Sequence, residues 1–167
     1  AQNETYALLG SLLSLQPKVS SGGGMSRDDV IDGLAAAILK RIPAEVPLAP
    51  VKRKYPVDYH ESMNTVLAQE TTRYNAVLAK INVDVLVLRK AVKGLVVMSA
   101  PLEAIGSAMF NNQVPDVWAK YPSLKPLASW VTDLEQRIAF LQDWIDNGIP
   151  SAFWVSGFYF PQAFLTG

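Results

Sequence analysis

Cysteine does not occur among the 167 residues of the chain. Its absence excludes disulfide bridges, thiolate nucleophiles and thiolate metal ligands together. No apolar run approaches the ~18 residues that a membrane-spanning helix needs; the most apolar stretch, 152–160, is interrupted by Ser156 and Gly157. Residues 1–4 do not lead from a basic segment into a long apolar run, as a signal peptide does. We therefore expect a soluble protein with no membrane partner.

An excess of charge of one sign is also missing, since 15 Lys and Arg balance 15 Asp and Glu. Without a net electrostatic field, the chain has nothing to attract nucleic acid or an anionic membrane. Half of the residues are hydrophobic and 18% are charged, a composition that favours a folded core over intrinsic disorder. The length suits one domain or two small ones.

Histidine is nearly absent, and the one present is His60. A metal site needs several converging ligands, whereas His60 and Glu61 are adjacent and point in different directions on a helix. A Ser-His-Asp triad would have to use the same histidine, and no nucleophile-elbow sequence accompanies it. The sequence thus predicts a solvated or capping His60, with no catalytic and no metal-binding residues.

The glycine-rich stretch 21–26 superficially resembles a phosphate-binding loop. Such a loop needs a lysine after its glycines and a strand before it. Here Met25 stands in the lysine position, the glycine spacing differs and a helix is expected to precede. We therefore predict no cofactor-binding residue. The four tryptophans are expected to pack in the core or between domains, with a ligand pocket as the alternative; they are Trp118, Trp130, Trp144 and Trp154.

Helical periodicity appears twice before residue 43. The first stretch covers about 3–16 and is followed by a flexible loop at 20–24. The second follows Ser26, which with Asp29 approximates a capping box, and continues to about Arg41. Prolines then recur at 43, 47, 50 and 56, which predicts an extended linker at 44–58. Its basic cluster 52–54 is either a solvated face or a contact with an acidic partner.

A heptad pattern follows the linker. Its apolar positions are spaced alternately by four and three residues, with Glu70 as the one charged member. This pattern predicts a helix of about 30 to 35 residues, ~50 Å long, that must pack along other helices. It should end or bend at Lys93-Gly94. The pattern residues are Met63, Leu67, Glu70, Tyr74, Leu78, Ile81, Val85, Leu88, Val92 and Leu95.

Two further helices are expected, one from Ser99 to about Asn111 and one over 127–146 that ends at Asn147-Gly148. A turn at 111–115 separates the first of these from a proline-punctuated connection. The aromatic stretch 153–160 is β-prone, and Pro161 is placed to begin another helix. The predicted fold class is all-α, a helical bundle built on one long helix with a short aromatic extended segment near its C-terminus.

Several strings are more particular than helix formation requires. The strings are 54–57 (KYPV), 61–70 (ESMNTVLAQE), 93–99 (KGLVVMS), 121–127 (YPSLKPL), 153–158 (FWVSGF) and 162–167 (QAFLTG). Together they make the chain similar to the C-terminal region of dynein heavy chains of the axonemal kind, and the part before residue 43 resembles the helical lid of the sixth AAA+ module.

The resemblance implies a division into a lid portion at 1–43, a linker at 44–58 and the helical start of a C-terminal domain at 59–167. It implies a fragment of a minus-end-directed microtubule motor of the cilium or flagellum axoneme, in the cytoplasm and cytoskeleton. ATP and Mg would bind elsewhere in the six-module ring. The implied partners are the other AAA+ modules, the dynein subunits and, through the parent motor, the microtubule. Because the fragment would stop before the family's small β-barrel, the aromatic stretch is expected to be exposed.

These implications and the long helix suggest a non-catalytic segment that braces the AAA+ ring and couples the motions of its modules. The competing hypothesis is an autonomous helical module that binds another dynein subunit or a regulator. An enzyme in its own right is the third, and it would have to bind nucleotide by itself.

Overall fold

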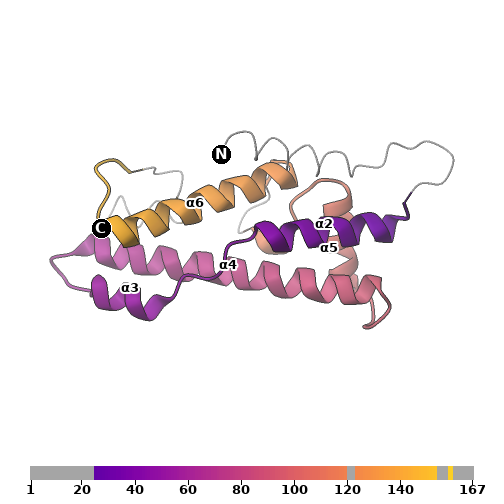
Figure 1. Cartoon of the computed structure of the whole chain (residues 1–167), viewed down its shortest axis with the longest axis horizontal. Helices are drawn as coiled ribbons and strands as arrows, with labels where there is room; N and C mark the ends of the chain where they lie inside the picture. Colours follow the sequence, from indigo (N-terminus) through magenta and orange to yellow (C-terminus); the bar gives the residue numbers. More distant parts are fainter. Residues whose placement is uncertain (1–24, 120–122, 154–157, 160–167) are drawn as a thin grey trace. The chain divides into compact units, whose positions relative to one another are not determined.

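The computed structural model describes residues 25–119, 123–153 and 158–159, and within them it contains helices and no strands, which confirms the all-α class. No helix in these ranges has the length and apolar character needed to cross a membrane. The predicted first helix, the glycine-rich loop before Met25 and the helix after Pro161 lie outside the described residues. Figure 1 shows the elements α2 (Arg27–Arg41), α3 (Leu48–Lys54), α4 (Ser62–Val92), α5 (Ala100–Phe110), the 3-10 turn η1 (Asp116–Trp118) and α6 (Leu127–Asn147).

The chain divides into two compact units. One, the α2–α5 unit, comprises 1–42 and 80–132; the other, the α3 unit, comprises 43–79 and 133–167. Helix α4 contributes 62–79 to the α3 unit and 80–92 to the α2–α5 unit. Helix α6 contributes 127–132 to the α2–α5 unit and 133–147 to the α3 unit.

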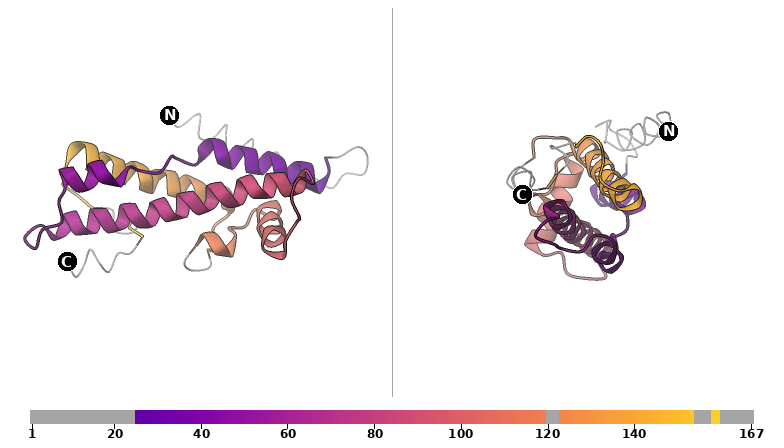
Figure 2. Two further views of the ribbon diagram at one scale, coloured as in Figure 1. Left: turned by 90° about the horizontal axis from the view of Figure 1, so that it is seen from below. Right: turned by 90° about the vertical axis from the view of Figure 1, so that its left-hand side faces the viewer.

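Helix α2 begins as predicted. The Ser26 hydroxyl accepts a hydrogen bond from the Asp29 amide at 3.1 Å, and the Asp29 carboxylate accepts one from the Ser26 amide at 3.3 Å. This capping box satisfies two amides that a helix start otherwise leaves without partners. Helix α5 packs against α2 and α4 at Gly106, where a Cβ would stand 3.5 Å from methyl groups of both Ile31 and Leu88, an ordinary van der Waals distance. Figure 2 shows α2 beside the second part of α4.

Helix α4 confirms the prediction of one long helix, with 31 residues from Ser62 to Val92. It ends where predicted, because Gly94 adopts φ +75° and the Leu95 amide donates back to the Lys90 carbonyl at 2.9 Å. This is a Schellman motif, which glycine forms without a Cβ penalty. The prediction that the heptad pattern includes Leu95 is wrong. The chain reverses direction at Gly94, and the Leu95 side chain is 72% exposed. The buried members are Leu67, Glu70, Tyr74, Leu78, Ile81, Val85 and Leu88.

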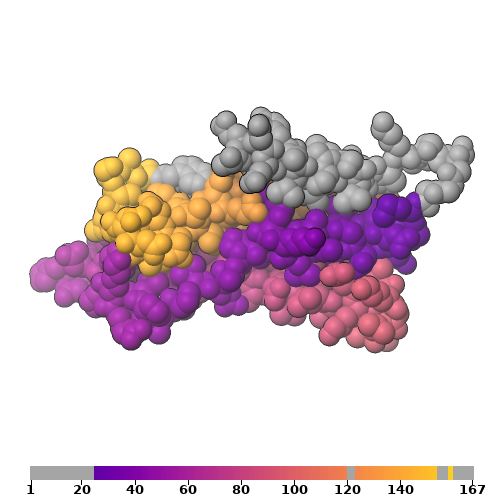
Figure 3. Space-filling model, in the orientation of Figure 1, coloured from indigo at the N-terminus to yellow at the C-terminus, as the bar shows by residue number. Residues whose placement is uncertain are grey.

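The prediction of an extended linker is wrong over residues 48–54, which form α3. Pro47 is the N-cap and Pro50 lies in the first turn, where a helix needs no amide donor, so neither proline interrupts the helix. Val51 is buried, and Figures 1 and 2 show α3 beside the first part of α4. Lys52 and Arg53 are exposed, and Figure 3 shows α3 on the surface of the viewed face.

The last two helices begin and end close to their predicted positions. The Ser99 hydroxyl caps α5 by accepting from the Leu102 amide at 3.4 Å. After α5 the chain turns at Asn112 (φ 54°), whose carbonyl accepts from the Leu127 amide at the start of α6. At the end of α6, Gly148 has φ +90° and donates to the Trp144 carbonyl. The turn and both helix ends are therefore confirmed.

Candidate functional site

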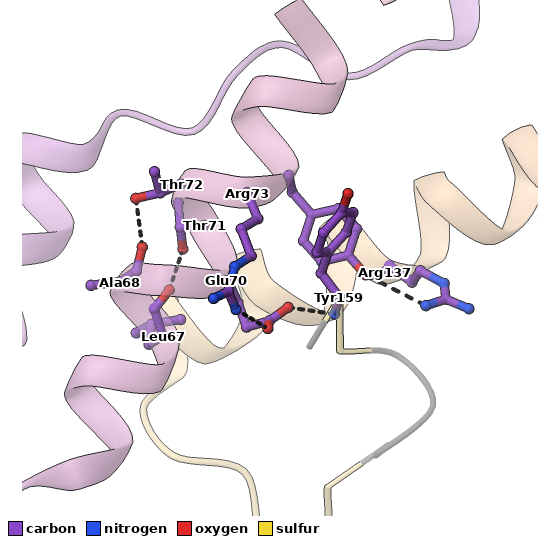
Figure 4. Close-up of polar contacts among 9 residues, drawn as sticks. Leu67, Ala68, Glu70, Thr71, Thr72, Arg73, Arg137 and Tyr159 are labelled. Atoms are coloured by element: carbon purple, nitrogen blue, oxygen red, sulfur yellow. Dashed lines mark hydrogen bonds and ion pairs between the residues drawn. The ribbon is translucent and has the colours of Figure 1, made fainter. Parts of the chain in front are cut away.

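Glu70 is the charged residue of the α4 pattern, and its side chain is fully buried in the α3 unit. One carboxylate oxygen accepts a hydrogen bond from the Tyr159 amide, and the other lies 3.5 Å from an Arg73 guanidinium nitrogen (Figure 4). A buried carboxylate needs such partners, because an uncompensated charge inside a protein costs several kcal/mol. Glu70 thus connects the backbone of Tyr159 to the long helix α4.

The threonines after Glu70 satisfy their own hydroxyl groups. Thr71 donates to the Leu67 carbonyl at 2.7 Å, and Thr72 donates to the Ala68 carbonyl at 2.8 Å (Figure 4). Such bonds to the carbonyl four residues earlier let a hydroxyl remain inside a helix without another partner. They help α4 to carry polar side chains next to Glu70.

Tyr74 lies one turn further along α4. Its burial raises its pKa above the ordinary value of 10.0, an effect opposed by the Arg137 guanidinium, which donates to the phenol oxygen at 3.5 Å. The Tyr159 ring meets the Tyr74 ring edge to face at 5.7 Å between centroids. Tyr159 therefore contacts α4 through its backbone at Glu70 and through its ring at Tyr74.

An aromatic cluster adjoins this contact in the α3 unit. Phe158 packs edge to face on Phe140 and Trp144, with ring centroids 6.0 and 6.3 Å apart, and Phe153 meets Trp144 at 5.5 Å. Phe158 is buried, so the expectation of an exposed aromatic stretch is wrong for this residue. Edge-to-face pairs add to the stabilisation from burial. Phe153, Phe158 and Tyr159 do not form a strand, and Trp154 and Val155 lie outside the described residues.

The basic cluster of α3 divides into two parts. The Lys54 ammonium donates to the carbonyls of Ile145 and Asp146 at 2.6 and 3.1 Å, near the C-terminal end of α6. The Tyr55 hydroxyl donates to the Trp144 carbonyl at 3.0 Å. These donors satisfy carbonyls that a helix end leaves without partners, and the cation complements the helix dipole. Lys52 and Arg53 are left as the solvated part of the cluster.

The second part of α4 carries charged contacts in the α2–α5 unit. Arg89 donates to Asp32 of α2 at 2.8 Å, and this hydrogen bond holds the pKa of Asp32 below its ordinary value. Asp84 accepts from the Trp118 indole at 3.0 Å and forms an ion pair with Lys80 at 3.1 Å. Trp118 is buried and stacks on Trp130. Both tryptophans, like Trp144, pack against other side chains, as the core interpretation predicted.

His60 is exposed in the turn before α4, where its amide donates to the Asp58 carboxylate. The solvated position predicted for it is confirmed. Within residues 25–119, 123–153 and 158–159, no three His, Asp or Glu side chains are grouped as a metal site would require. The acidic residues Asp28 and Asp29 lie in the first turn of α2, where their negative charge complements the helix dipole.

These polar contacts hold neighbouring helices and backbone segments together within each unit. Sequence reasoning missed the partners of Glu70 and Lys54, because they lie far away in the sequence. A usable signal existed for Glu70, since a charged residue in an apolar heptad pattern must find a buried partner.

Comparison with known proteins assigns a family to this helical architecture. The family model of the C-terminal domain of dynein heavy chains matches residues 2–167. The chain is 57% identical to dynein axonemal heavy chain 1 of Rattus norvegicus, over all of its own length and 4% of that protein. It is 46% identical to dynein axonemal heavy chain 3 of Mus musculus, over 98% of its length and 4% of that protein. It is 46% identical to dynein axonemal heavy chain 12 of Homo sapiens, over 98% of its length and 5% of that protein.

The chain thus spans only a small part of the length of these relatives. Because the family model and the sequence identity both extend over nearly all of its residues, the chain belongs to the family of C-terminal domains of dynein heavy chains.

Proposed function

We propose that the chain is a non-catalytic segment of an axonemal dynein, an ATP-driven microtubule motor of the cilium or flagellum. In this proposal the segment braces the AAA+ ring of the heavy chain and couples the motions of its modules. ATP and Mg act elsewhere in the heavy chain, and the segment itself binds no cofactor. The names of the relatives support the axonemal motor, and the fold supports the mechanical role.

The observation that carries the proposal is the continuity of α4. One helix of 31 residues takes part in two compact units. Its backbone hydrogen bonds make it stiff, so a displacement at one end is transmitted along its axis rather than absorbed. Coupling between modules requires an element of this kind, whose position depends on both of its ends.

Side-chain contacts along α4 add to this support. In the α3 unit, Asn75 and Glu70 hold backbone groups of Val46 and Tyr159. In the α2–α5 unit, Arg89 holds α2 through Asp32. Because each contact is directional, a movement of α4 displaces its neighbours within that unit.

We further propose that residues 1–43 are the lid portion of the last AAA+ module, that 44–58 connect it to the C-terminal domain, and that 59–167 are the helical start of that domain. The lid of a ring module and the long helix then belong to one continuous stretch of polypeptide. A bracing element that begins within a module receives the motion of that module directly.

Substitution of Ala76 by proline in the full-length heavy chain tests the coupling. Ala76 is exposed in the middle of α4, and proline there removes a hydrogen bond and kinks the helix at a cost of about 3 kcal/mol. We expect ATP hydrolysis to continue while microtubule gliding slows several-fold. The matched control is Ala76→Gln, which keeps the helix and should glide like the unmodified motor. Equal velocity and equal ATPase rate in all three proteins contradict the proposal.

A second candidate function is supported by the exposed Lys52 and Arg53 of α3. An autonomous interaction module would use them to bind an acidic dynein subunit or regulator. Charge reversal of both residues should then abolish capture of that subunit from an axonemal extract, with Lys125→Glu as the control at another exposed lysine. Undiminished capture by the reversed protein removes this function and leaves the bracing role.

A further inference from the structure

Trp144 of α6 is a fully buried tryptophan whose polar atom lacks an acceptor. Its side chain is 0% exposed, and among the described residues no acceptor lies within hydrogen-bond distance of its indole nitrogen Nε1. Trp118 in the α2–α5 unit differs, because its indole donates to the Asp84 carboxylate at 3.0 Å. A buried tryptophan usually has such a partner, since an unpaired donor loses its hydrogen bond to water without a replacement. Burial of Trp144 therefore carries a free-energy cost that burial of Trp118 does not.

Aromatic rings of the α3 unit surround Trp144. Phe140 lies one turn earlier on α6, with ring centroids 6.5 Å apart, and Phe153 and Phe158 meet the indole at 5.5 and 6.3 Å. An aromatic ring is at most a weak hydrogen-bond acceptor. Phe158, itself 3% exposed, thus helps to exclude water from the indole without taking the place of water as an acceptor.

The next residue, Tyr159, is attached to α4 by a contact that also opposes itself in part. Its amide donates to the fully buried Glu70 carboxylate (Figure 4). Removal of a carboxylate from water offsets much of the attraction that the carboxylate gains inside the protein. We call Phe158 and Tyr159 the strap. When closed, the strap buries an aromatic ring and forms a hydrogen bond, but it leaves an indole donor unpaired and a carboxylate desolvated.

We infer that the strap is a releasable closure over α4 and α6, and that the unpaired Trp144 donor favours its release. Water reaches Nε1 when the strap opens and accepts the hydrogen bond that the closed state does not provide. The closed state is therefore weaker than its apolar contacts alone would make it. Segments of this kind open locally while the rest of a fold stays intact. Release gives the α3 unit a second state, in which the Trp144 donor faces solvent.

Replacement of the indole N–H by sulfur tests the inference in the full-length heavy chain. Benzothienylalanine, which has nearly the shape of tryptophan but no donor, replaces Trp144. Chymotrypsin cleaves after Phe158 when the strap is open, so the cleavage rate, measured by mass spectrometry of the peptides, follows the open population. We expect this rate to fall about fivefold, because the closed state no longer contains an unpaired donor. Cleavage after Tyr59, which is 95% exposed, is the internal reference and should not change.

The matched control places benzothienylalanine at Trp118, where the donor is paired with Asp84. That exchange removes a satisfied hydrogen bond in the other unit, so it should leave the rate of cleavage after Phe158 within about twofold of the unmodified heavy chain. A cleavage rate after Phe158 that is unchanged or higher in the Trp144 variant overturns the inference.

Hydroxyl-radical oxidation of the heavy chain provides a measurement without any substitution at Trp144. Trp144 and Trp118 are 0% and 3% exposed, so a fold that stays closed protects them alike. We expect Trp144 to be oxidised about fivefold faster, since release of the strap admits solvent to it. Glu70→Leu, which removes the acceptor of the Tyr159 amide, should increase oxidation of Trp144 but not of Trp118. Equal oxidation of the two tryptophans in the unmodified chain also overturns the inference. None of these outcomes depends on the gliding velocity, which tests the coupling at Ala76.

Discussion

The side chain of Asn75 pairs with both backbone groups of Val46, as one peptide group pairs with another in a sheet. The Val46 amide donates to the Asn75 carbonyl oxygen at 2.8 Å, and the Asn75 amide nitrogen donates to the Val46 carbonyl at 2.7 Å. Both residues are buried. This contact fastens the segment before α3 to the middle of α4 and satisfies the backbone groups of a buried residue that lies between two helices.

Replacement of Asn75 by alanine should therefore destabilise the protein by about 2–4 kcal/mol, because a buried amide and a buried carbonyl lose their partners. The measurement is urea denaturation followed by circular dichroism. Asn82→Ala is the matched control, since Asn82 is exposed on the same helix and should change the stability by about 0.5 kcal/mol or less. Equal effects at the two positions would show that the paired contact contributes nothing.

Two substitutions of Glu70 separate its charge from its role as an acceptor. Glutamine keeps a carbonyl oxygen for the Tyr159 amide, whereas leucine completes the apolar pattern but offers no acceptor. We expect Glu70→Leu to raise the rate of chymotrypsin cleavage after Phe158 and Tyr159 about tenfold, since loss of a buried hydrogen bond amounts to about 1–3 kcal/mol. Glu70→Gln should stay within about threefold of the unmodified protein.

The helical content of both Glu70 variants, measured by circular dichroism, serves as the control for folding. Faster cleavage of both variants to the same extent would assign the contact to charge rather than to the hydrogen bond. An unchanged rate of chymotrypsin cleavage in both variants would mean that Glu70 does not hold Phe158 and Tyr159 in place.

The features that the sequence predicted well are those encoded within a few residues. The capping box of Ser26 and Asp29, the heptad pattern of α4 and the helix end at Gly94 each depend on spacings of seven residues or fewer. Local chemistry is sufficient for these, so α4 was predicted close to its observed bounds, and the all-α class followed from it.

The failures depend on register or on distance along the sequence. The prolines of 44–58 predicted that no helix would form there. Pro47 and Pro50, however, lie at the start of α3, where a helix tolerates proline. Tyr159 lies 89 residues from Glu70, and Ile145 lies 91 residues from Lys54. Nothing in the local pattern brings such residues together. The buried polar contacts, which make up the candidate site, therefore required the structure.

The Asp32–Arg89 pair predicts a dependence of stability on pH. A carboxyl whose pKa is lowered by folding binds protons less tightly in the folded protein. The resulting stabilisation is present above the ordinary value of 3.8 and is lost as the pH falls through the lowered pKa. A double-mutant cycle of Asp32→Asn and Arg89→Gln should give about 0.5–1 kcal/mol of coupling at neutral pH, as expected for a partly exposed pair. The coupling, measured by urea denaturation, should decline at pH values below 3.8. A coupling that is constant with pH would contradict this assignment.

Two glycines with open space around them should respond oppositely to alanine. Neither Gly33 nor Gly94 has any atom within 4 Å of an added Cβ, but Gly94 has φ +75° at the end of α4, and Gly33 lies inside α2. Gly94→Ala should destabilise the protein by about 1–2 kcal/mol, because an alanine is strained in the left-handed conformation. Gly33→Ala should stabilise it by about 0.5–1 kcal/mol, since the unfolded state loses conformational freedom. Thermal denaturation of both variants measures the difference. A neutral Gly94→Ala would mean that the turn after α4 rearranges without cost, so that this turn does not determine where the long helix ends.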